Sequence, residues 1–571
     1  MRAGRAWAAA ALLLAVMAAQ MVTAIPHASA VVDEPAHLAA GYRALAAGDL
    51  VVNREHPPLA KAIAALPLLF SDIVLPAAPA EARQRATEDF EFGYSREFLY
   101  KANDADALLG LARLPIVAMT LCAGVALFVW ARRLPLSPDG AAARAAVAAL
   151  ALFAFEPNLL AHGRLVTTDM AATLFALCTF ACLERSLGKP GRSALWAALS
   201  GVCLGAALAS RFSSLLLVPL MAVSTALDRR APGAPRWRLL GLSVLVALVV
   251  LNLCYGELPG ASIFPVAAEP IGGPLHSQPL GMMEANPALR RIPMPVPRLY
   301  IEGLDLARWK NRYVEGPGFL NGAYSSEGWW SYFVLALSMK TSLPLLLLSA
   351  VGAGATLAGL RRAGPAARTL LAHVLVPAAG MILLVTAMTR AQIGLRYVLP
   401  AIPFLCLAAS AGACRLRLPP WTGRAALALP ALLLVWHAAG ALRVHPYHLA
   451  YINEAWGGPQ EGYRRLVDSN YDWGQDLVGL RRFMDERRLQ RINLYYFGTA
   501  DPAYYRIERA VPPEPGYYAV SATHLAGVYL PQRDYLSPFA AMTPETTIGY
   551  SIRVYHLEQV PEFLRTPIRA R

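Results

Sequence analysis

Residues able to carry acid–base chemistry gather in a few short segments of an otherwise apolar chain. The first segment follows an apolar stretch and reads Asp33-Glu34-Pro35-Ala36-His37. A carboxylate placed there can act as a general base that deprotonates an acceptor hydroxyl or amine. Asp33 and His37, four residues apart, would share one face of a helix, which makes His37 a candidate to bind the acceptor or the sugar. The structural alternative is that Asp33 caps a helix with Pro35 in its first turn.

A second segment reads Glu55-His56-Pro57-Pro58-Leu59-Ala60-Lys61. The proline pair fixes the backbone and can begin a helix, which leaves Glu55 and His56 at its entrance. Glu55 and His56 are suitable ligands for a divalent metal cation, while His56 and Lys61 are cations able to face a phosphate. The alternative is an interfacial helix that begins at proline and carries incidental charges.

Two further segments place single charged residues beside apolar stretches. Asp169 follows Thr168 at the expected start of a helix, where a carboxylate suits the positive end of the helix dipole. Arg390 and Arg396 frame a tight turn. Arg396 can bind a lipid-linked phosphate through its guanidinium group, or extend to a lipid headgroup.

The C-terminal part concentrates polar and aromatic residues in the segment Asp468–Asp476. Asn470, Asp472 and Trp473 form a mixture that suits binding of an acceptor or a sugar, with the aromatic ring under the sugar and the amide on its hydroxyls. The alternative is that Asp472 caps the following helix, and that the rest of the segment docks the tail on the membrane part.

Membrane helices must position these segments. Hydrophobic residues make up 56% of the 571 residues, charged residues only 16%, and the mean hydropathy is +0.40. Apolar runs of about twenty residues recur and are long enough to cross the hydrocarbon layer. We predict an α-helical polytopic membrane protein. Its eleven expected spans lie near 7–27, 107–131, 143–160, 169–187, 193–209, 211–227, 239–255, 331–357, 369–389, 396–413 and 425–441.

The first span has an alternative interpretation as a cleavable signal peptide. Arg2 and Arg5 precede an apolar stretch, and Ala28-Ser29-Ala30 has the small residues of a cleavage site. The apolar stretch is longer than the usual signal core of roughly 7–15 residues, which favours an uncleaved anchor.

Charge placement predicts the orientation of the chain. With a cytoplasmic N-terminus, basic residues outnumber acidic ones in every predicted cytoplasmic loop, as the positive-inside rule requires. Two long external loops then cover 28–106 and 256–330, and residues 1–441 form one membrane domain. The tail, 442–571, is external. Its helical run at Asp476–Arg488 and strand-like stretches at Ile492–Phe497, Tyr517–Ser521 and Ile548–His556 predict a small α/β domain.

Composition excludes two other classes of protein. The net charge of +14 comes mostly from arginines in short loops, and no cluster of Lys and Arg with interleaved aromatic residues predicts nucleic-acid binding. The seven cysteines lie in or beside apolar segments, and none lies in the tail. A disulfide-stapled external domain is therefore excluded, and no CxxC pair predicts a zinc site.

The order of these motifs resembles the polyprenyl-phosphate-dependent glycosyltransferases of the GT-C class. The family concerned, family 39, contains protein O-mannosyltransferases and aminoarabinose transferases. The resemblance covers roughly residues 1–440 and is carried by Asp33-Glu34, Glu55-His56-Pro57-Pro58-Leu59, Thr168-Asp169 and Arg396-Tyr397, in this order. The tail motifs look like those of an uncharacterised bacterial branch, which indicates no particular acceptor.

The resemblance implies a role for each matching residue. Asp33 would be the carboxylate nearest the acceptor, with Glu34 supporting it and Asp169 as a second acidic position. His56 and Arg396, with Lys61, would hold the donor phosphate. Glu55 would be a ligand of a possible divalent metal cation. His276 is the candidate for the histidine that completes such a metal site in the aminoarabinose branch.

The resemblance also implies the partners and the location of the protein. The donor would be a polyprenyl-phosphate-linked sugar that transfers a hexosyl or pentosyl group, and membrane lipids would surround the spans. The acceptor, which is a protein, a glycolipid or a polysaccharide, stays open. The expected location is the bacterial plasma membrane.

Two alternatives come from other classes of protein. A secondary transporter would place its functional polar residues near the bilayer midplane and show internal repeats, whereas the ionisable residues here cluster toward one face. A non-catalytic scaffold with a glycan- or protein-binding external domain predicts that Asp33, Glu55 and Arg396 lie far apart.

Overall fold

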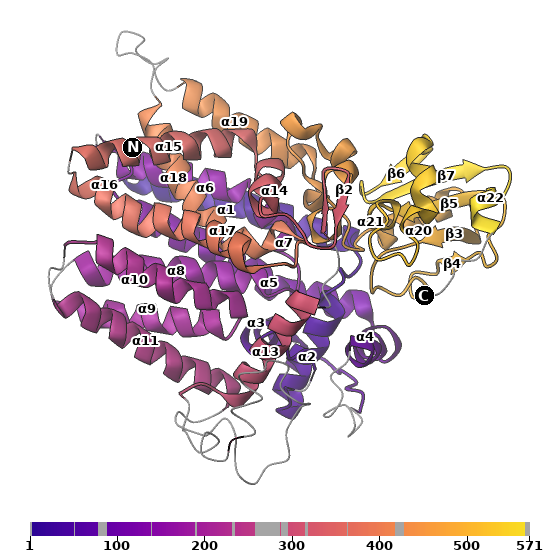
Figure 1. Ribbon diagram of the computed structural model, residues 1–571, viewed down its shortest axis with the longest axis horizontal. Helices are drawn as coiled ribbons and strands as arrows, with labels where there is room; N and C mark the ends of the chain where they lie inside the picture. The colour runs from indigo at the N-terminus through magenta and orange to yellow at the C-terminus, as the bar shows by residue number, and fades with distance from the viewer. Residues whose placement is uncertain are drawn as a thin grey trace.

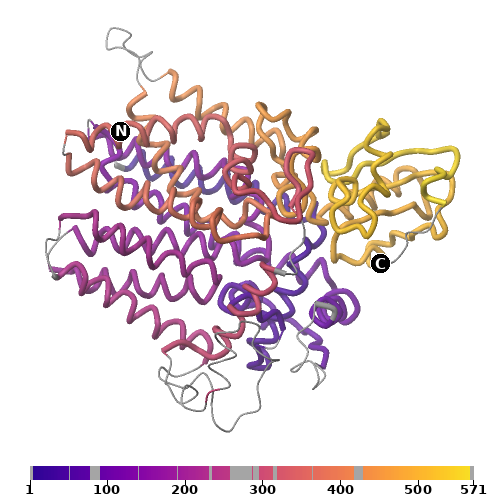
Figure 2. Tube along the Cα trace, viewed as in Figure 1, coloured from indigo at the N-terminus to yellow at the C-terminus, as the bar shows by residue number. Residues whose placement is uncertain are grey.

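The computed structural model describes residues 3–50, 52–77, 88–138, 140–188, 191–230, 234–256, 286, 295–313, 318–362, 364–416 and 428–565. Its helices lie side by side in a large bundle, and a smaller domain with a β-sheet caps one end of that bundle (Figure 1). The Cα trace shows that the chain enters this domain only after the last long helix (Figure 2). The predicted helical membrane part with a C-terminal α/β domain is confirmed.

Within the part of the chain that the structure describes, seven helical segments are long and apolar enough to cross a membrane. Their helices are α1 (Ala3–Ala24), α5 (Ala105–Ala131), α8 (Asp169–Gly188), α11 (Ala234–Tyr255), α15 (Leu343–Arg361), α16 (Pro365–Leu370) continued by α17 (Val376–Met388), and α18 (Ile402–Arg415). Shorter apolar helices are α6 (Ala142–Ala154), α9 (Ser193–Leu208), α10 (Leu217–Leu227) and α19 (Ala428–Arg443). The chain is thus a multi-pass membrane protein, and each of the eleven predicted spans falls on an apolar helix.

Two predicted spans are interrupted in the structure. The span predicted at 143–160 breaks after α6, because the side chain of Glu156 accepts hydrogen bonds from the backbone of a new short helix, α7 (Pro157–His162). The span predicted at 331–357 breaks into α14 (Tyr332–Lys340) and α15. Ser342 caps α15 there, and proline occupies its first turn. Local capping overrides the continuous apolar pattern at both sites.

The described part of the first long loop, predicted at 28–106, folds largely into helices. They are α2 (Glu34–Ala47), α3 (Pro58–Ala65) and α4 (Glu88–Arg96). The described part of the second long loop contributes α13 (Arg298–Tyr313) and a hairpin of β1 (Gly318–Leu320) and β2 (Ala323–Ser325). His276 lies outside the described residues.

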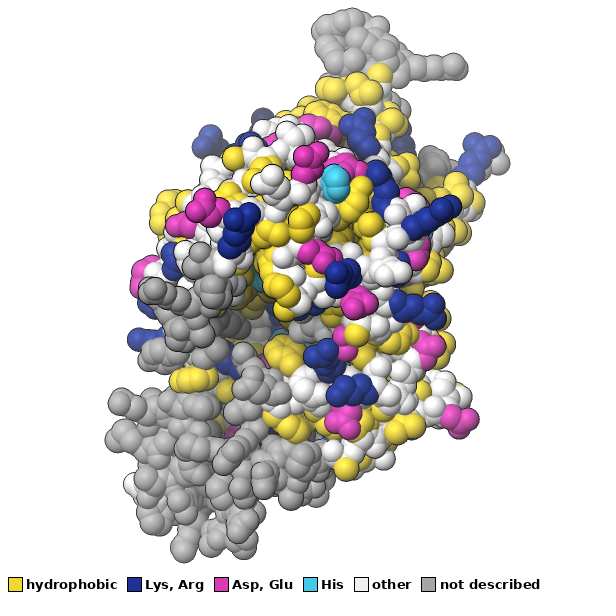
Figure 3. All heavy atoms as spheres, turned by 90° about the vertical axis from the view of Figure 1, so that its right-hand side faces the viewer, with side chains coloured by type: hydrophobic (Ala, Val, Ile, Leu, Met, Phe, Trp, Pro, Cys, Tyr) yellow, Lys and Arg dark blue, Asp and Glu magenta, His cyan; other side chains and the backbone are white. Residues whose placement is uncertain are grey.

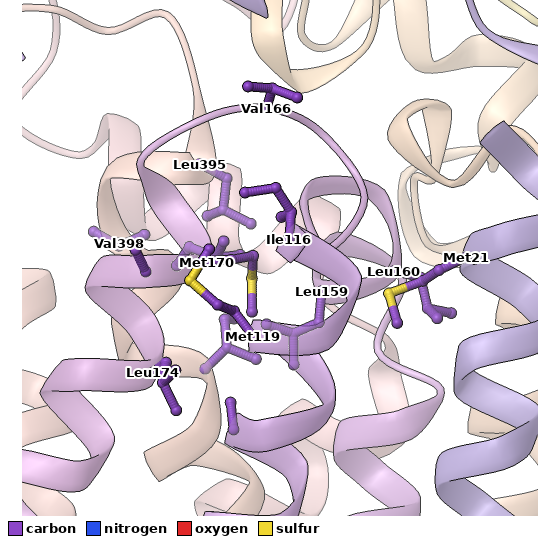
Figure 4. Close-up of a cluster of buried hydrophobic side chains, with 14 of the residues drawn as sticks. Met21, Ile116, Met119, Leu159, Leu160, Val166, Met170, Leu174, Leu395 and Val398 are labelled. Carbon is purple, nitrogen blue, oxygen red and sulfur yellow. The ribbon is translucent and has the colours of Figure 1, made fainter. Parts of the chain in front are cut away.

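A layer of buried apolar side chains supports the segments that carry the predicted site (Figure 4). Met170 follows Asp169 at the start of α8, and Leu395 precedes Arg396 in the turn before α18; both are essentially inaccessible to solvent. Because protein interiors are close-packed, this layer fixes where the two charged neighbours can lie.

The tail domain is built on a five-stranded mixed sheet with the strand order β4-β3-β5-β7-β6. The strands are β3 (Arg491–Tyr495), β4 (Glu508–Arg509), β5 (Gly516–Ser521), β6 (Thr546–Ile548) and β7 (Ile552–Leu557). The pairs β3–β4 and β3–β5 are parallel, and β5–β7 and β6–β7 are antiparallel. The helices are α20 (Leu477–Glu486), α21 (Ala522–Leu525) and α22 (Glu562–Arg565).

The surface of the tail end carries acidic and basic side chains interspersed with apolar ones (Figure 3). Such a mixed surface is typical of a domain that faces water. The membrane helices differ, because large apolar side chains such as Leu253, Leu383 and Val435 are exposed on them.

Candidate active site

An ion pair between Asp33 and Arg396 joins two segments that lie 363 residues apart in the chain. Arg396, in the 3-10 turn Leu395–Ala401, donates from a terminal guanidinium nitrogen to Asp33 Oδ2. Asp33 stands at the N-cap position of α2, but its side chain makes no capping hydrogen bond because it turns toward Arg396. Burial acts to raise the pKa of Asp33, yet the charge of Arg396 and its hydrogen bond to the carboxylate outweigh burial and hold this pKa below its ordinary value.

A second ion pair lies beside the first. Asp169, at the start of α8, accepts from Arg211, which precedes the 3-10 turn Phe212–Leu216. The guanidinium carbons of Arg211 and Arg396 lie 4.9 Å and 5.6 Å from the centroid of the Tyr397 ring. Both guanidinium groups therefore contact the same aromatic ring, and the two ion pairs, Asp33–Arg396 and Asp169–Arg211, form a single buried cluster of alternating charge.

Arg211 is the residue of this cluster that the sequence motifs missed. In the sequence it only interrupts a long apolar run, where it separates two predicted spans. That interruption could have indicated a functional residue, because burying an arginine in a membrane region costs free energy unless the side chain has a partner or a function. Here its partner is Asp169.

Two neutral histidines border the cluster. The rings of His37 and His56 lie 4.8 Å apart between centroids. His37 Nδ1 lies 3.0 Å from the carbonyl oxygen of Val166, so Nδ1 carries the proton and donates. His37 Nε2 and His56 Nδ1 are buried and have no hydrogen-bond partner among the described residues.

Both histidines are neutral near neutral pH, whereas His56 was predicted to be a cation. Burial lowers the pKa of His37 to about 4, although Asp33 acts in the opposite direction. Burial, with the nearby cations, holds the pKa of His56 well below its ordinary value. Near neutral pH, His56 can therefore donate a hydrogen bond to a phosphate but contributes no charge.

Lys61 holds the loop before α3 instead of pointing into open space. Its Nζ donates to the carbonyl oxygen of Asn53 at 2.7 Å, to the side chain of Asn53 at 3.1 Å and to the carbonyl oxygen of His56 at 2.7 Å. An ammonium group has three donors, so these acceptors occupy all of them. Lys61 therefore reaches a donor phosphate only if this loop rearranges.

The Glu55 carboxylate pairs with a lysine and also contacts one further carboxyl group, that of Glu91. Lys310 Nζ lies 2.9 Å from Glu55 Oε1. Burial and the neighbouring Glu55 raise the pKa of Glu91 well above its ordinary value. Among the described residues, no group of three or more His, Cys, Asp or Glu side chains is arranged to hold a metal ion. Lys310 occupies one side of the Glu55 carboxylate, and His276, the other candidate ligand, lies outside the described residues, so the metal site stays a prediction.

Glu34 lies beside Asp33 but faces the opposite way. Its carboxylate accepts from Arg113 at 2.9 and 2.6 Å, and from the backbone N–H groups of Val31 and Val166 at 3.0 and 2.9 Å. The side chain is fully buried. With its acceptor positions engaged, Glu34 fixes the segment that leads to Asp33 and has no oxygen directed at a substrate.

The tail residues predicted to bind an acceptor or a sugar are buried in the contact between tail and membrane part. Asn470, Asp472 and Trp473 are each at most 1% exposed. Asn470 Oδ1 accepts from the backbone of Leu395, and Asp472 Oδ2 accepts from the backbone of Thr523. The Trp473 ring lies 4.5 Å from the guanidinium carbon of Arg396. The geometry favours the docking alternative for these three residues.

Two recesses border the charged cluster. One is a small recess of about 20 Å³ between α8, α10 and α17 that reaches Tyr397; its lining residues are Ala172, Ala176, Ser213, Ser214, Leu216, Leu217, Met381, Val385, Tyr397 and Pro400. The other, also of about 20 Å³, lies next to α3; its lining includes Arg54, His56, Lys61, Tyr255 and Leu299. The first recess is mostly apolar and lies among membrane helices, and the second is basic.

Comparison with known proteins supports the resemblance for one part of the chain. Residues 110–255, which include the Thr168-Asp169 motif, match the family described as dolichyl-phosphate-mannose-protein mannosyltransferase. This match confirms the resemblance over that part of the chain. No curated protein matches the chain.

Several solved structures overlap with it at low sequence identity. ArnT from Cupriavidus metallidurans bound to undecaprenyl phosphate is 14% identical, with 97% of this chain and 98% of that chain covered and a TM-score of 0.47. The Archaeoglobus fulgidus oligosaccharyltransferase in the apo form is 13% identical, with 85% and 60% covered and a TM-score of 0.45. The oligosaccharyltransferase AglB of the same organism, in complex with an inhibitory peptide and a dolichol-phosphate, is 11% identical, with 85% and 59% covered and a TM-score of 0.48.

Proposed function

We propose that this protein transfers a sugar from a polyprenyl-phosphate carrier to an acceptor at the external face of the membrane. The observation that carries the proposal is the buried contact between Asp33 and Arg396, with Asp169 and Arg211 beside it. Inverting displacement needs a base for the acceptor and positive charge for the departing phosphate. This cluster provides both. The scaffold alternative gains support if Asp33, Glu55 and Arg396 lie far apart. Asp33 and Arg396 are in contact, whereas Glu55 contacts Lys310.

The donor phosphate binds at the two arginines that share the Tyr397 ring. Guanidinium groups match phosphate oxygens in geometry and charge. The small apolar recess that ends at Tyr397 lies on the side from which the first part of the polyprenyl chain would approach. Arg211 therefore joins Arg396 as a phosphate ligand. His56, from the basic recess next to α3, adds a neutral donor.

Donor binding prepares Asp33 for its role as base. When the phosphate draws Arg396 away, Asp33 loses the charge that holds its pKa down, and burial raises the pKa. Asp33 then accepts the proton of the acceptor hydroxyl or amine while that atom bonds to the anomeric carbon. The bond from this carbon to the phosphate oxygen breaks, and Arg396 and Arg211 stabilise the charge left on the polyprenyl phosphate.

The orientation follows from the charge of the loops. With the N-terminus in the cytoplasm of a bacterial cell, the tail domain and α2 face outward, and the site opens at the outer leaflet of the plasma membrane. The sugar is a hexosyl or a pentosyl group, and the acceptor is a protein, a glycolipid or a polysaccharide.

The test uses purified full-length protein in lipid nanodiscs, a panel of polyprenyl-phosphate sugars and membrane extracts as the source of acceptor. We expect labelled product with one donor, and Asp33→Asn to lower the turnover by roughly 10²- to 10⁴-fold, the usual contribution of a positioned base. Asp49→Asn is the matched control, because Asp49 is a loop carboxylate paired with Arg43 at 2.8 Å, away from the cluster. Undiminished transfer by the Asp33→Asn enzyme refutes the assignment of the base.

A further inference from the structure

One segment of the tail, Ser469–Gln475, contacts both halves of the Asp33–Arg396 pair; we call it the tail clamp. On the Arg396 side, Asn470 Oδ1 accepts from the backbone N–H of Leu395 at 2.8 Å. Ser469 Oγ donates to the carbonyl oxygen of Ile393 at 2.8 Å. The turn that carries Arg396 is thus bonded to the tail immediately before that residue.

The other half of the pair is bonded to the same segment through its backbone. Val32 N–H donates to the carbonyl oxygen of Trp473 at 3.0 Å, and Ser29 N–H donates to that of Gln475 at 2.8 Å. Ser29 Oγ adds a bond of 3.0 Å to the carbonyl oxygen of Gly474. Asp33 follows directly after Val32, so the tail clamp fixes its position as well.

The tail clamp is itself held from two sides. Lys340 Nζ, at the end of α14, donates to the carbonyl oxygen of Asn470 at 2.6 Å, and Asn470 Nδ2 donates to the Tyr332 hydroxyl at 2.9 Å. On the tail side, the backbone of Thr523 donates to Asp472 at 2.8 Å. The segment is therefore a fixed connection between tail domain and membrane part.

The two segments approach closely at Gly394. A Cβ placed there would overlap Ser469 Oγ, so a side chain at this position would displace the hydroxyl that bonds to Ile393.

We propose that the tail clamp is part of the donor site, with Trp473 and Asn470 as positioning residues that hold Arg396 in place for the phosphate. The proposal rests on the proposed function, because it takes the ligand of Arg396 to be a lipid-linked phosphate. When that phosphate draws Arg396 from Asp33, the aromatic faces of Trp473 and Tyr397 still hold the guanidinium. A guanidinium group that is already held in place loses less conformational entropy when the phosphate binds.

The experiment measures the affinity of the full-length protein in nanodiscs for undecaprenyl phosphate as the probe, by native mass spectrometry. A cation–π contact of this type corresponds to a roughly 2- to 30-fold change in affinity. We expect Trp473→Leu to weaken binding within this range and Trp473→Phe to restore part of it, because phenylalanine keeps an aromatic face. Asn470→Ala should also weaken binding, since it releases the Leu395 backbone.

A double-mutant cycle separates positioning from general destabilisation. Trp473→Leu should have no further effect on affinity in an Arg396→Gln background, because Trp473 acts through Arg396. The control is Arg96→Gln, which removes another contact between tail and membrane part, the pair Arg96–Asp501 at 2.8 Å. Its affinity should equal that of the unmodified protein.

The outcomes distinguish this inference from the proposed function. If Arg396→Gln weakens binding but Trp473→Leu and Trp473→Phe do not, the tail clamp has no role in the donor site. Equal losses from Trp473→Leu with and without Arg396 also overturn it, because they indicate a purely structural effect. If the unmodified protein binds no undecaprenyl phosphate, or Arg396→Gln binds it equally well, the proposed function itself fails.

Discussion

Replacing Glu34 by alanine is expected to destabilise the fold rather than to remove a catalytic group. Arg113 donates two hydrogen bonds to this carboxylate, and its remaining donors reach the carbonyl oxygens of Ile25, Ala28 and Ser29. The exposed fractions of the Arg113 and Glu34 side chains are 2% and 0%. Without Glu34 a guanidinium charge stays buried with no anion beside it.

The magnitude follows from this burial. Removing one partner of a buried ion pair costs about 3–5 kcal/mol, and the N–H groups of Val31 and Val166 lose their acceptor as well. Glu34→Ala should therefore lower the free energy of unfolding by at least about 3 kcal/mol. The double variant Glu34→Leu, Arg113→Met should recover part of that loss, because it leaves no unpaired charge.

The assay is unfolding by SDS in mixed micelles, followed by far-UV circular dichroism. Burial opposes ionisation of Glu34, but Arg113 outweighs it and holds the pKa below the ordinary value of 4.5. The stabilisation by the pair is therefore present above pH 4.5 and is lost as the pH falls through the lowered pKa. A Glu34→Ala protein that unfolds like the unmodified one, yet transfers no sugar, would show that Glu34 supports catalysis and that the structural argument is wrong.

Three further changes test other parts of the fold. Burial raises the pKa of Asp476 to about 8 from 3.8. The free energy of unfolding should therefore fall as the pH rises from about 4 to about 8, by at most about 1.4 kcal/mol per pH unit. Asp476→Asn should flatten the plot of melting temperature against pH over this range. A Cβ on Gly352 would overlap the backbone of α18, whereas one on Gly354 meets nothing. In the SDS assay, Gly352→Ala should therefore lower the free energy of unfolding by about 1–3 kcal/mol, and Gly354→Ala should not lower it measurably. Lys340→Met leaves the carbonyl oxygens of Leu449 and Asn470 without the ammonium donor, which should lower the free energy of unfolding by about 1–3 kcal/mol for each. Limited proteolysis should then release the tail domain faster than from the unmodified protein. Unchanged cleavage would contradict this role of Lys340.

The sequence indicated where helices begin better than where they are interrupted. A run of apolar residues predicts a membrane helix because the bilayer offers no other partner for backbone groups. It does not reveal that Glu156 turns its side chain back to cap a new helix, or that Ser342 does the same before α15. These breaks depend on single side-chain hydrogen bonds that hydropathy does not record.

Adjacent residues with similar chemistry received different roles from the fold. Asp33 and Glu34 were both expected at the reaction centre, but consecutive positions at the start of a helix point in different directions. Asp33 meets Arg396 and Glu34 meets Arg113. Similarly, Lys61 has the charge to bind phosphate, but its three donors are bonded to the neighbouring loop.

By itself, the sequence determined the class of protein, the approximate position of its membrane helices, the α/β character of its tail and the identity of Asp33 and Arg396 as charged groups outside the apolar runs. Those properties follow from local composition, which the bilayer and the hydrogen-bonding needs of the backbone translate directly into structure. Only the tertiary structure decided that Arg211 joins these groups and that Trp473 lies against Arg396. Such contacts join residues far apart in the chain, and their geometry is set by the packing of whole helices, which no local pattern contains.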